Sequence, residues 1–239
     1  MRLTLIRHAT IVVELGGLRL LVEPMLDPPG ARPPVEDSPN ARPNPLVPLP
    51  MPAEEIVAGL DAAIVTHLHR DHFDETGARL LPRDIPVFCQ PEDAEHLRGL
   101  GLDARPVADE LVWDGLRIAR TGGRHGSDDA TVAELAPVSG FVLDGLYIAG
   151  DTVWCSVVEE AIERHRPRVA VVNGSGARFL TGGPLVMTAE QVGEVVERVP
   201  TVVVVHLEAI NHCLETRAEL RAVVPDALVP EDGETLELG

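Results

Sequence analysis

The chain has 239 residues, a length that one α/β domain can fill. Its 20 basic and 38 acidic residues give a net charge of −18, which argues against nucleic acid as a partner because duplex binding needs basic clusters that neutralise phosphates. No apolar run approaches the roughly 20 residues of a membrane span. The three cysteines are scattered along the chain without the CxxC spacing of a zinc or redox motif. We therefore expect one cytoplasmic domain over residues 1–239, without a membrane partner; self-association into a homo-oligomer stays open.

The first elements are a pair of strands and a proline-rich segment. Residues 3–15 and 18–22 alternate as strands do, and Gly16-Gly17 supplies the turn between them. Residues 27–52 hold ten of the chain's 21 prolines, which exclude a central strand or a helix interior because proline removes a donor and fixes φ. We expect this segment to be an ordered surface loop that forms one wall of a substrate cleft.

From residue 53 onward, helical and strand patterns alternate around two hairpins. The dipeptides Asp114-Gly115 and Asp144-Gly145 predict the hairpin turns. Helices are predicted over 53–60, from Asp74, from Pro91, over 157–164, and after the capping boxes that begin at Thr188 and Thr216. Strands are predicted over 62–66, 86–89, 116–119, 146–149, 168–172 and 201–205. Two mixed sheets packed face to face, with helices outside, satisfy this α/β pattern.

One short segment concentrates metal-binding residue types. It holds His67, His69, Asp71 and His72 within six residues. Placing them together at a strand end would be costly in repulsion and desolvation unless they bind a cation. His67, His69 and Asp71 share the two-residue period of an extended chain and so should point the same way, whereas His72 is out of phase unless the chain turns. Imidazoles with a carboxylate suit zinc, manganese or iron rather than calcium.

Three further candidates follow strand-forming runs elsewhere in the chain: His125, Asp151 and His206. Strand ends converge at one edge of a sheet, so residues far apart in the sequence can surround one site. His96 and His165 lie on polar helical stretches, and we expect them to be structural or solvated. Arg70, Arg124 and Arg178 lie near the expected site as candidates for recognising an anionic group.

These motifs, in their order along the chain, resemble those of the metallo-β-lactamase superfamily. The match runs from the first hairpin to the last strand. The Arg7-His8-Ala9 segment resembles the sequences of the branch that contains ascorbate-6-phosphate lactonase. The resemblance implies a four-layer αββα sandwich with its active site along one edge of the two sheets. The implied ligands are His67, His69 and His125 for a first metal ion, and Asp71, His72 and His206 for a second, with Asp151 bridging the two ions.

Several roles near this site stay open. In the family, the early strand usually ends in an aspartate that supports the metal loop, and here either Glu23 or Asp27 takes that part. His8 is either a hydrogen-bonding partner of a ligand or a buried polar residue. His212 is either a proton donor or oxyanion contact, or a helix-start histidine with a structural hydrogen bond.

The predicted function is that of a metal-dependent hydrolase. Two divalent ions, zinc first and manganese or iron as alternatives, would activate a bridging hydroxide. Asp71 would orient it and carry its proton, and His212 is the second candidate catalytic residue. The expected substrate is a small ester, lactone or phosphoester, and an anionic substrate would find positive charge at the metal ions. The alternatives are a phosphodiesterase acting on phospholipid or nucleotide, an iron-dependent redox enzyme, and a non-catalytic metal-binding protein.

Overall fold

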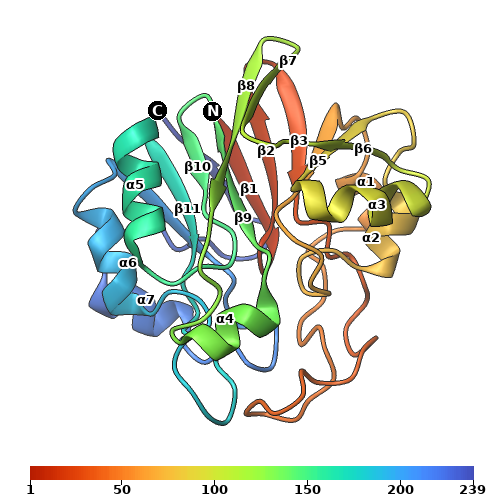
Figure 1. The fold of residues 1–239 in the computed structure, drawn as a ribbon. Coiled ribbons are helices and arrows are strands. Elements are labelled where there is room, and N and C mark those ends of the chain that lie inside the picture. Colours follow the sequence, from red (N-terminus) through yellow and green to blue (C-terminus); the bar gives the residue numbers. More distant parts are fainter.

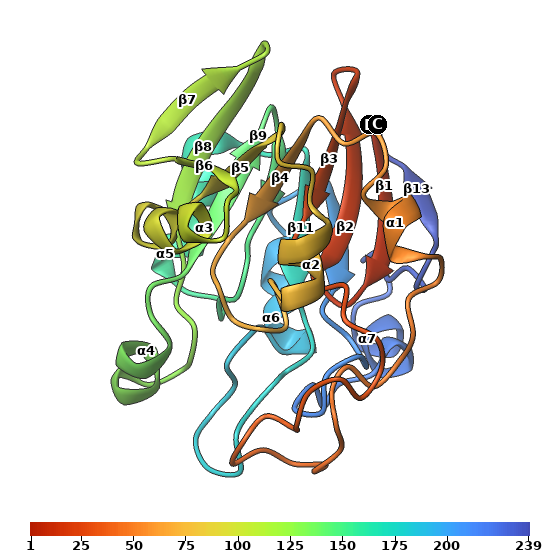
Figure 2. The ribbon, with the colours of Figure 1, turned by 90° about the vertical axis from the view of Figure 1, so that its right-hand side faces the viewer.

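Two mixed β-sheets pack face to face in the computed structural model, which describes residues 1–239 (Figures 1 and 2). The first sheet has the order β13-β1-β2-β3-β4-β5-β6. Its strands are β1 (Arg2–Arg7), β2 (Thr10–Leu15), β3 (Leu18–Val22), β4 (Ala62–Val65), β5 (Pro86–Cys89), β6 (Asp103–Pro106) and β13 (Thr235–Glu237). Strands β1 to β3 pair antiparallel as hairpins, whereas β3 to β6 pair parallel, because helical crossovers connect most of these strands.

The second sheet has the order β12-β11-β10-β9-β8-β7. Its strands are β7 (Glu110–Trp113), β8 (Leu116–Gly122), β9 (Ser139–Leu143), β10 (Leu146–Ile148), β11 (Val169–Asn173) and β12 (Thr201–Val205). The two predicted hairpin turns join β7 to β8 and β9 to β10, and Asp114 and Asp144 adopt the positive φ that such turns require.

Helices cover the outer face of each sheet (Figure 1). On the first sheet lie α1 (Ala53–Ile56), α2 (Glu75–Leu80), the 3₁₀ turn Pro91–Asp93 and α3 (Ala94–Gly99); on the second lie α5 (Ser156–His165), α6 (Ala189–Val196) and α7 (Arg217–Val223). The short α4 (Asp129–Leu135) stands at the end of the sandwich. This is the predicted αββα arrangement. None of the helices is both long and apolar enough to cross a membrane.

The layer between the sheets is aliphatic, as the low aromatic content predicts. Among its buried residues only Phe88 and Phe141 are aromatic. The capping boxes at Thr188 and Thr216 are both formed, and Asp74 caps α2 by accepting a hydrogen bond from Gly77 N, so these three helix starts agree with the prediction. The helix predicted over 53–60 is shorter and ends at Ile56.

The first strand differs from the prediction in a way that matters for the site. Residues 3–15 do not form one strand, because the chain turns back at His8-Ala9 and pairs β1 with β2. His8 lies in this turn with φ of 61°, a left-handed conformation that is uncommon for residues other than glycine. No glycine or Asn-Gly pair marks the turn, so local sequence patterns could not reveal it.

Residues 27–52 contain no helix or strand and cross the end of the sandwich beside the loop before α6 (Figure 2). The fully buried Arg7 fastens the segment to β1, since its guanidinium donates hydrogen bonds to the carbonyls of Val47, Met25 and Asp27 at 2.9–3.0 Å. The segment is therefore held at the edge where the ends of several strands meet.

Candidate metal centre

Candidate ligands from both sheets meet at one edge of the sandwich. His67 follows β4 in the first sheet, while His125, Asp151 and His206 follow β8, β10 and β12 in the second. All four side chains are buried, and ion-pair distances join His67, His125 and His206 to Asp151. The convergence of strand ends inferred from the sequence is therefore present in the structure.

The segment after β4 turns within the histidine motif. The backbone N–H groups of His72 and Phe73 both donate to the carbonyl of His69 at 2.9 Å. Because of this turn, Asp71 does not share the direction of His67 and His69, and the alternation predicted for these three residues is wrong. The nitrogens of His67, His69 and His125 form one cluster, and those of His72 and His206 form a second with Asp71.

Asp151 lies between the two clusters and directs one oxygen at each. Its Oδ2 is 3.3 Å from His125 Nε2 and 3.9 Å from His67 Nε2. Its Oδ1 is 3.2 Å from His72 Nε2 and 3.4 Å from His206 Nε2. A single carboxylate can thus contact ions in both clusters.

Hydrogen bonds orient most of the rings. Four of the histidines use Nδ1 for a contact outside the clusters, which leaves Nε2 to face inward. The partners are Thr66 Oγ1 for His67 (2.9 Å), Leu185 O for His125 (3.1 Å), Ser175 Oγ for His206 (3.0 Å) and Glu23 for His72. His69 differs, because its Nδ1 faces inward at 3.0 Å from His67 Nε2. Asn173 Nδ2 donates to Asp151 Oδ1 at 2.6 Å and so holds this carboxylate in place.

Glu23 is the acidic residue that supports the 67–72 loop. It is buried at the end of β3, accepts hydrogen bonds from Thr66 N (2.7 Å) and Thr66 Oγ1 (2.9 Å), and contacts His72 Nδ1. Asp27 lies elsewhere, 3.3 Å from Arg32 Nε. Of the two residues left open by the sequence, the structure places Glu23 against the loop.

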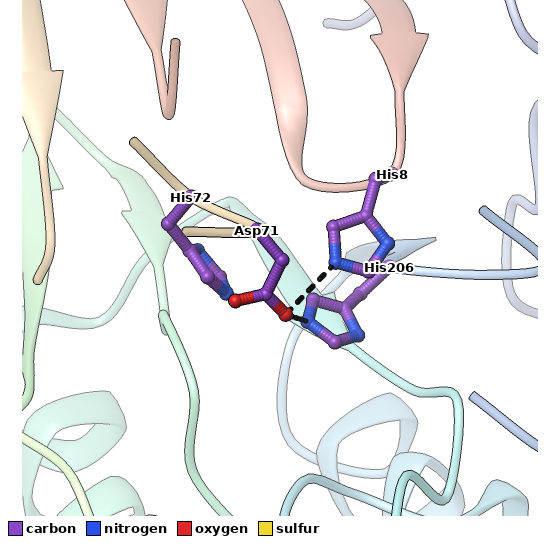
Figure 3. A group of neighbouring side chains, drawn as sticks. All are labelled: His8, Asp71, His72 and His206. Atoms are coloured by element: carbon purple, nitrogen blue, oxygen red, sulfur yellow. Dashed lines mark ion pairs between the residues drawn. The ribbon is translucent and has the colours of Figure 1, made fainter. Parts of the chain in front are cut away.

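His8 also lies in the second cluster (Figure 3). Its ring is fully buried, its Nε2 is 3.5 Å from Asp71 Oδ2, and its ring centroid is 3.7 Å from that of His206. The sequence left its role open because a single histidine in an apolar run is most often structural. The available signals were a histidine within the alternation of the first strand and the family resemblance of Arg7-His8-Ala9, and neither assigns a role to the His8 ring.

The charge balance of the clusters fits bound cations. Burial by itself would raise the pKa of Asp151, but His72 and the other neighbouring imidazoles hold it well below its usual range. Burial would lower the pKa of His206, yet the Asp151 carboxylate raises it to about 10. His8 Nε2, His72 Nε2 and His206 Nε2 are buried without hydrogen-bond partners, an arrangement that cations among them would satisfy. Imidazole nitrogens with two carboxylates fit zinc, manganese or iron.

A cavity of about 410 Å³ opens over the clusters. His69, Asp71, His125 and His212 belong to its lining. The rest of the lining is largely apolar and comes from the proline-rich segment, α4 and the loop before α6: Pro33, Pro34, Val35, Leu135, Phe179 and Leu185, with Leu68 and Ile210.

Polar groups in this cavity include two that bear on substrate binding. His212 is buried, and burial lowers its pKa to about 4, so its ring is neutral near pH 7. Arg32 also lines the cavity, and its Nη2 is buried without a partner. Sequence reasoning missed Arg32, because nothing in the proline-rich segment showed which of its residues faces the site. Of the three arginines it did consider, Arg70 lines the cavity, Arg124 pairs with Asp129, and Arg178 is exposed and is not part of the cavity lining.

Fold and site together define a metal-dependent hydrolase of the metallo-β-lactamase superfamily. Residues 19–207 match the family model described as Beta-lactamase superfamily domain, and the chain belongs to this family. Over 98% of its length it is 37% identical to the UPF0173 protein YddR of Bacillus subtilis (strain 168), of which it covers 99%. It is 25% identical to a UPF0173 metal-dependent hydrolase of Methanocaldococcus jannaschii, with 82% of this chain and 90% of that protein covered.

Two solved structures are similar over the whole chain. One is the isothiocyanate hydrolase from Delia radicum gut bacteria, 37% identical with a TM-score of 0.92, covering 100% of this chain and 99% of the other. The other is a possible metal-dependent hydrolase from Veillonella parvula DSM 2008, 30% identical with a TM-score of 0.94 and the same coverage. The superfamily and the hydrolase class predicted from the sequence are thus confirmed.

Proposed function

We propose that this hydrolase acts on a small, largely apolar molecule at an electrophilic carbon, with one divalent ion in each histidine cluster. The observation that carries the proposal is Asp151, which directs one oxygen to each cluster beneath a cavity whose outer walls are largely apolar. The bound cations, with zinc first and manganese or iron as alternatives, would supply the Lewis acidity that activates water and polarises the attacked group. The proposed ligands are His67, His69 and His125 for one ion, Asp71, His72 and His206 for the other, and Asp151 for both.

Two residues of the chain are proposed to handle protons and charge during the reaction. Asp71 is partly exposed to the cavity, and neighbouring imidazoles, His72 foremost, keep its pKa well below its usual range although burial would raise it. Its carboxylate can accept a proton from the attacking water and pass it to the leaving group. His212 is neutral, so it is suited to donate an N–H hydrogen bond to a developing oxyanion. Because the pKa of His212 is low, its ring is less suited to act as a protonated imidazolium that donates a proton to the leaving group.

The cavity favours an uncharged substrate body. Esters and lactones have an electrophilic carbonyl carbon, and the central carbon of an isothiocyanate is electrophilic in the same sense. The similarity to an isothiocyanate hydrolase over the whole chain makes an isothiocyanate the first substrate to test. Addition of water to that carbon, with a proton placed on nitrogen, followed by cleavage of the C–N bond would release an amine and carbonyl sulfide.

A phosphoester is the second candidate. Arg32 and Arg70 both line the cavity and could pair with a phosphate group. Arg32 is already 3.3 Å from the Asp27 carboxylate, which offsets part of its charge. We therefore rank a phosphoester below a substrate with an electrophilic carbon.

A panel of matched substrates tests this ranking. Metal-loaded protein is assayed with benzyl isothiocyanate, p-nitrophenyl butyrate, a γ-lactone and bis(p-nitrophenyl) phosphate, and chelated protein serves as the control. We expect kcat/KM for at least one carbon-centred substrate to exceed that for the phosphodiester by at least about tenfold, a difference of about 1.4 kcal/mol in transition-state binding. A preference for the phosphodiester would reverse the ranking, and no metal-dependent turnover of any substrate would contradict the proposed substrate class.

A further inference from the structure

His8 occupies an unusual position for a buried histidine. It belongs to the turn between β1 and β2, yet its ring enters the cluster of Asp71, His72 and His206 (Figure 3). Ligand atoms of these four residues lie within 4.8 Å of one another. The His8 side chain is fully buried, and neither of its ring nitrogens has a hydrogen-bond partner. Buried polar groups are nearly always paired, so this ring lacks a partner of some kind.

The distances around Asp71 indicate what that partner is. His8 Nε2 and His206 Nε2 lie 3.5 and 3.6 Å from the same atom, Asp71 Oδ2. A hydrogen bond between such atoms would be about 2.7–3.2 Å long. Atoms that bind one ion at about 2.1 Å, at angles near 90–110°, stand about 3.0–3.4 Å apart. The spacing is therefore closer to that of ligands around one ion than to that of a hydrogen-bonded pair.

The backbone keeps His8 in this place. Its φ of 61° is a strained conformation for a residue other than glycine, and its carbonyl accepts a hydrogen bond from His206 N at 2.9 Å. The ring of His8 packs on that of His206 at a centroid distance of 3.7 Å. Strain of this kind persists where surrounding structure enforces it, and it is concentrated at functional sites.

We infer that His8 is an additional ligand of the ion held by Asp71, His72 and His206. The inference rests on the proposed two-ion site. It makes the two positions unequal, because the ion near His8 would have five protein donors, including Asp151, and the ion near His67 would have four. The ion near His67, with fewer protein donors, would keep an open coordination position for water or substrate, as catalytic metal sites do.

The test counts histidine ligands in the cobalt-loaded wild-type protein. Each coordinated imidazole keeps one exchangeable N–H, whose proton NMR signal is strongly shifted by the bound cobalt and disappears in D₂O. Six such signals are expected if His8 is a ligand, and five would overturn the inference. Metal content is measured separately by mass spectrometry. Fewer than two ions per chain in the wild type would contradict the proposed function, and this outcome is distinct from two ions with five signals.

Variants provide the second arm. His8→Ala and His8→Gln should each lose one shifted signal and weaken binding of one ion by at least about tenfold in a chelator competition, while the other ion stays bound. His96→Ala, which alters an exposed histidine on α3, is the matched control and should keep all six signals. A His8 variant that binds both ions unchanged with an unaltered cobalt spectrum would overturn the inference. If neither His8 variant folds, the wild-type count still decides.

Discussion

Single side chains in this site have separate tasks that the ligand motif does not reveal. Glu23 accepts two hydrogen bonds from Thr66 and contacts His72, so one carboxylate holds both ends of the histidine-rich turn. The family usually has an aspartate in this role, and the longer glutamate reaches the loop from a left-handed backbone position at φ of 53°. Asp71 and His212, by contrast, both line the cavity, and both have proposed roles in the reaction.

Substitutions at these two positions should separate chemistry from metal binding. Asp71→Asn should lower kcat by about 10²-fold or more, because the amide cannot accept the proton of the attacking water. It should also lower the affinity of the protein for the ion proposed to lie near His72 and His206. His212→Ala should lower kcat by about 10²-fold with both ions retained, because only an oxyanion contact is lost. Steady-state kinetics and metal analysis measure the two effects. Loss of an ion in His212→Ala, with none lost in Asp71→Asn, would show that the two roles are assigned the wrong way round.

At the scale of elements, the proline-rich segment forms one wall of the cavity and is attached beside the histidine clusters. Asn211, between the cavity residues Ile210 and His212, is its main attachment. Its Oδ1 accepts hydrogen bonds from Val35 N (2.9 Å) and Asn44 Nδ2 (2.7 Å), and its Nδ2 donates to Ser38 Oγ and Pro39 O. One buried amide thus sets the distance between two sides of the cavity.

Removal of this amide should affect substrate binding more than chemistry. Asn211→Ala leaves buried partners unsatisfied, which should lower the free energy of unfolding by about 1–3 kcal/mol. The loosened wall should raise KM severalfold while kcat changes less. Denaturant titration and steady-state kinetics test both effects. The matched control is Asn40→Gly, at an exposed residue of the same segment with one long hydrogen bond to Asn211 O (3.4 Å); glycine tolerates the positive φ of 57° at this position. Equal behaviour of the two variants would refute the role of Asn211.

At the scale of the whole molecule, the site exists only because the two sheets pack together. The first sheet brings His8, Glu23 and the 67–72 segment, and the second brings His125, Asp151 and His206. Ions bound by ligands from both sheets would link the two halves of the sandwich. Without them, buried carboxylates and imidazoles face one another with unsatisfied atoms.

Metal removal should therefore destabilise the fold. A ligand present at about 1,000 times its Kd stabilises the native state by about 4 kcal/mol. For a protein of this size, that loss corresponds to a fall in Tm on the order of 10 °C. Thermal unfolding followed by circular dichroism, with and without chelator and after readdition of zinc or manganese, measures the shift. A Tm that does not depend on metal would rule out this stabilising link between the sheets.

The sequence by itself determined the superfamily, the two mixed sheets with outer helices, and the strand ends at which His67, His125, Asp151 and His206 lie. It could do so because hydrophobic periodicity and helix caps are local, and because the spacing of the histidine motif is distinctive. Only the tertiary structure decided that the chain turns within the 67–72 segment, that Glu23 rather than Asp27 supports the loop, and that His8 and Arg32 face the site. These outcomes depend on one turn hidden in an apolar run and on distances across two packed sheets. Such distances arise from the packing of residues far apart in the chain, which no local pattern encodes.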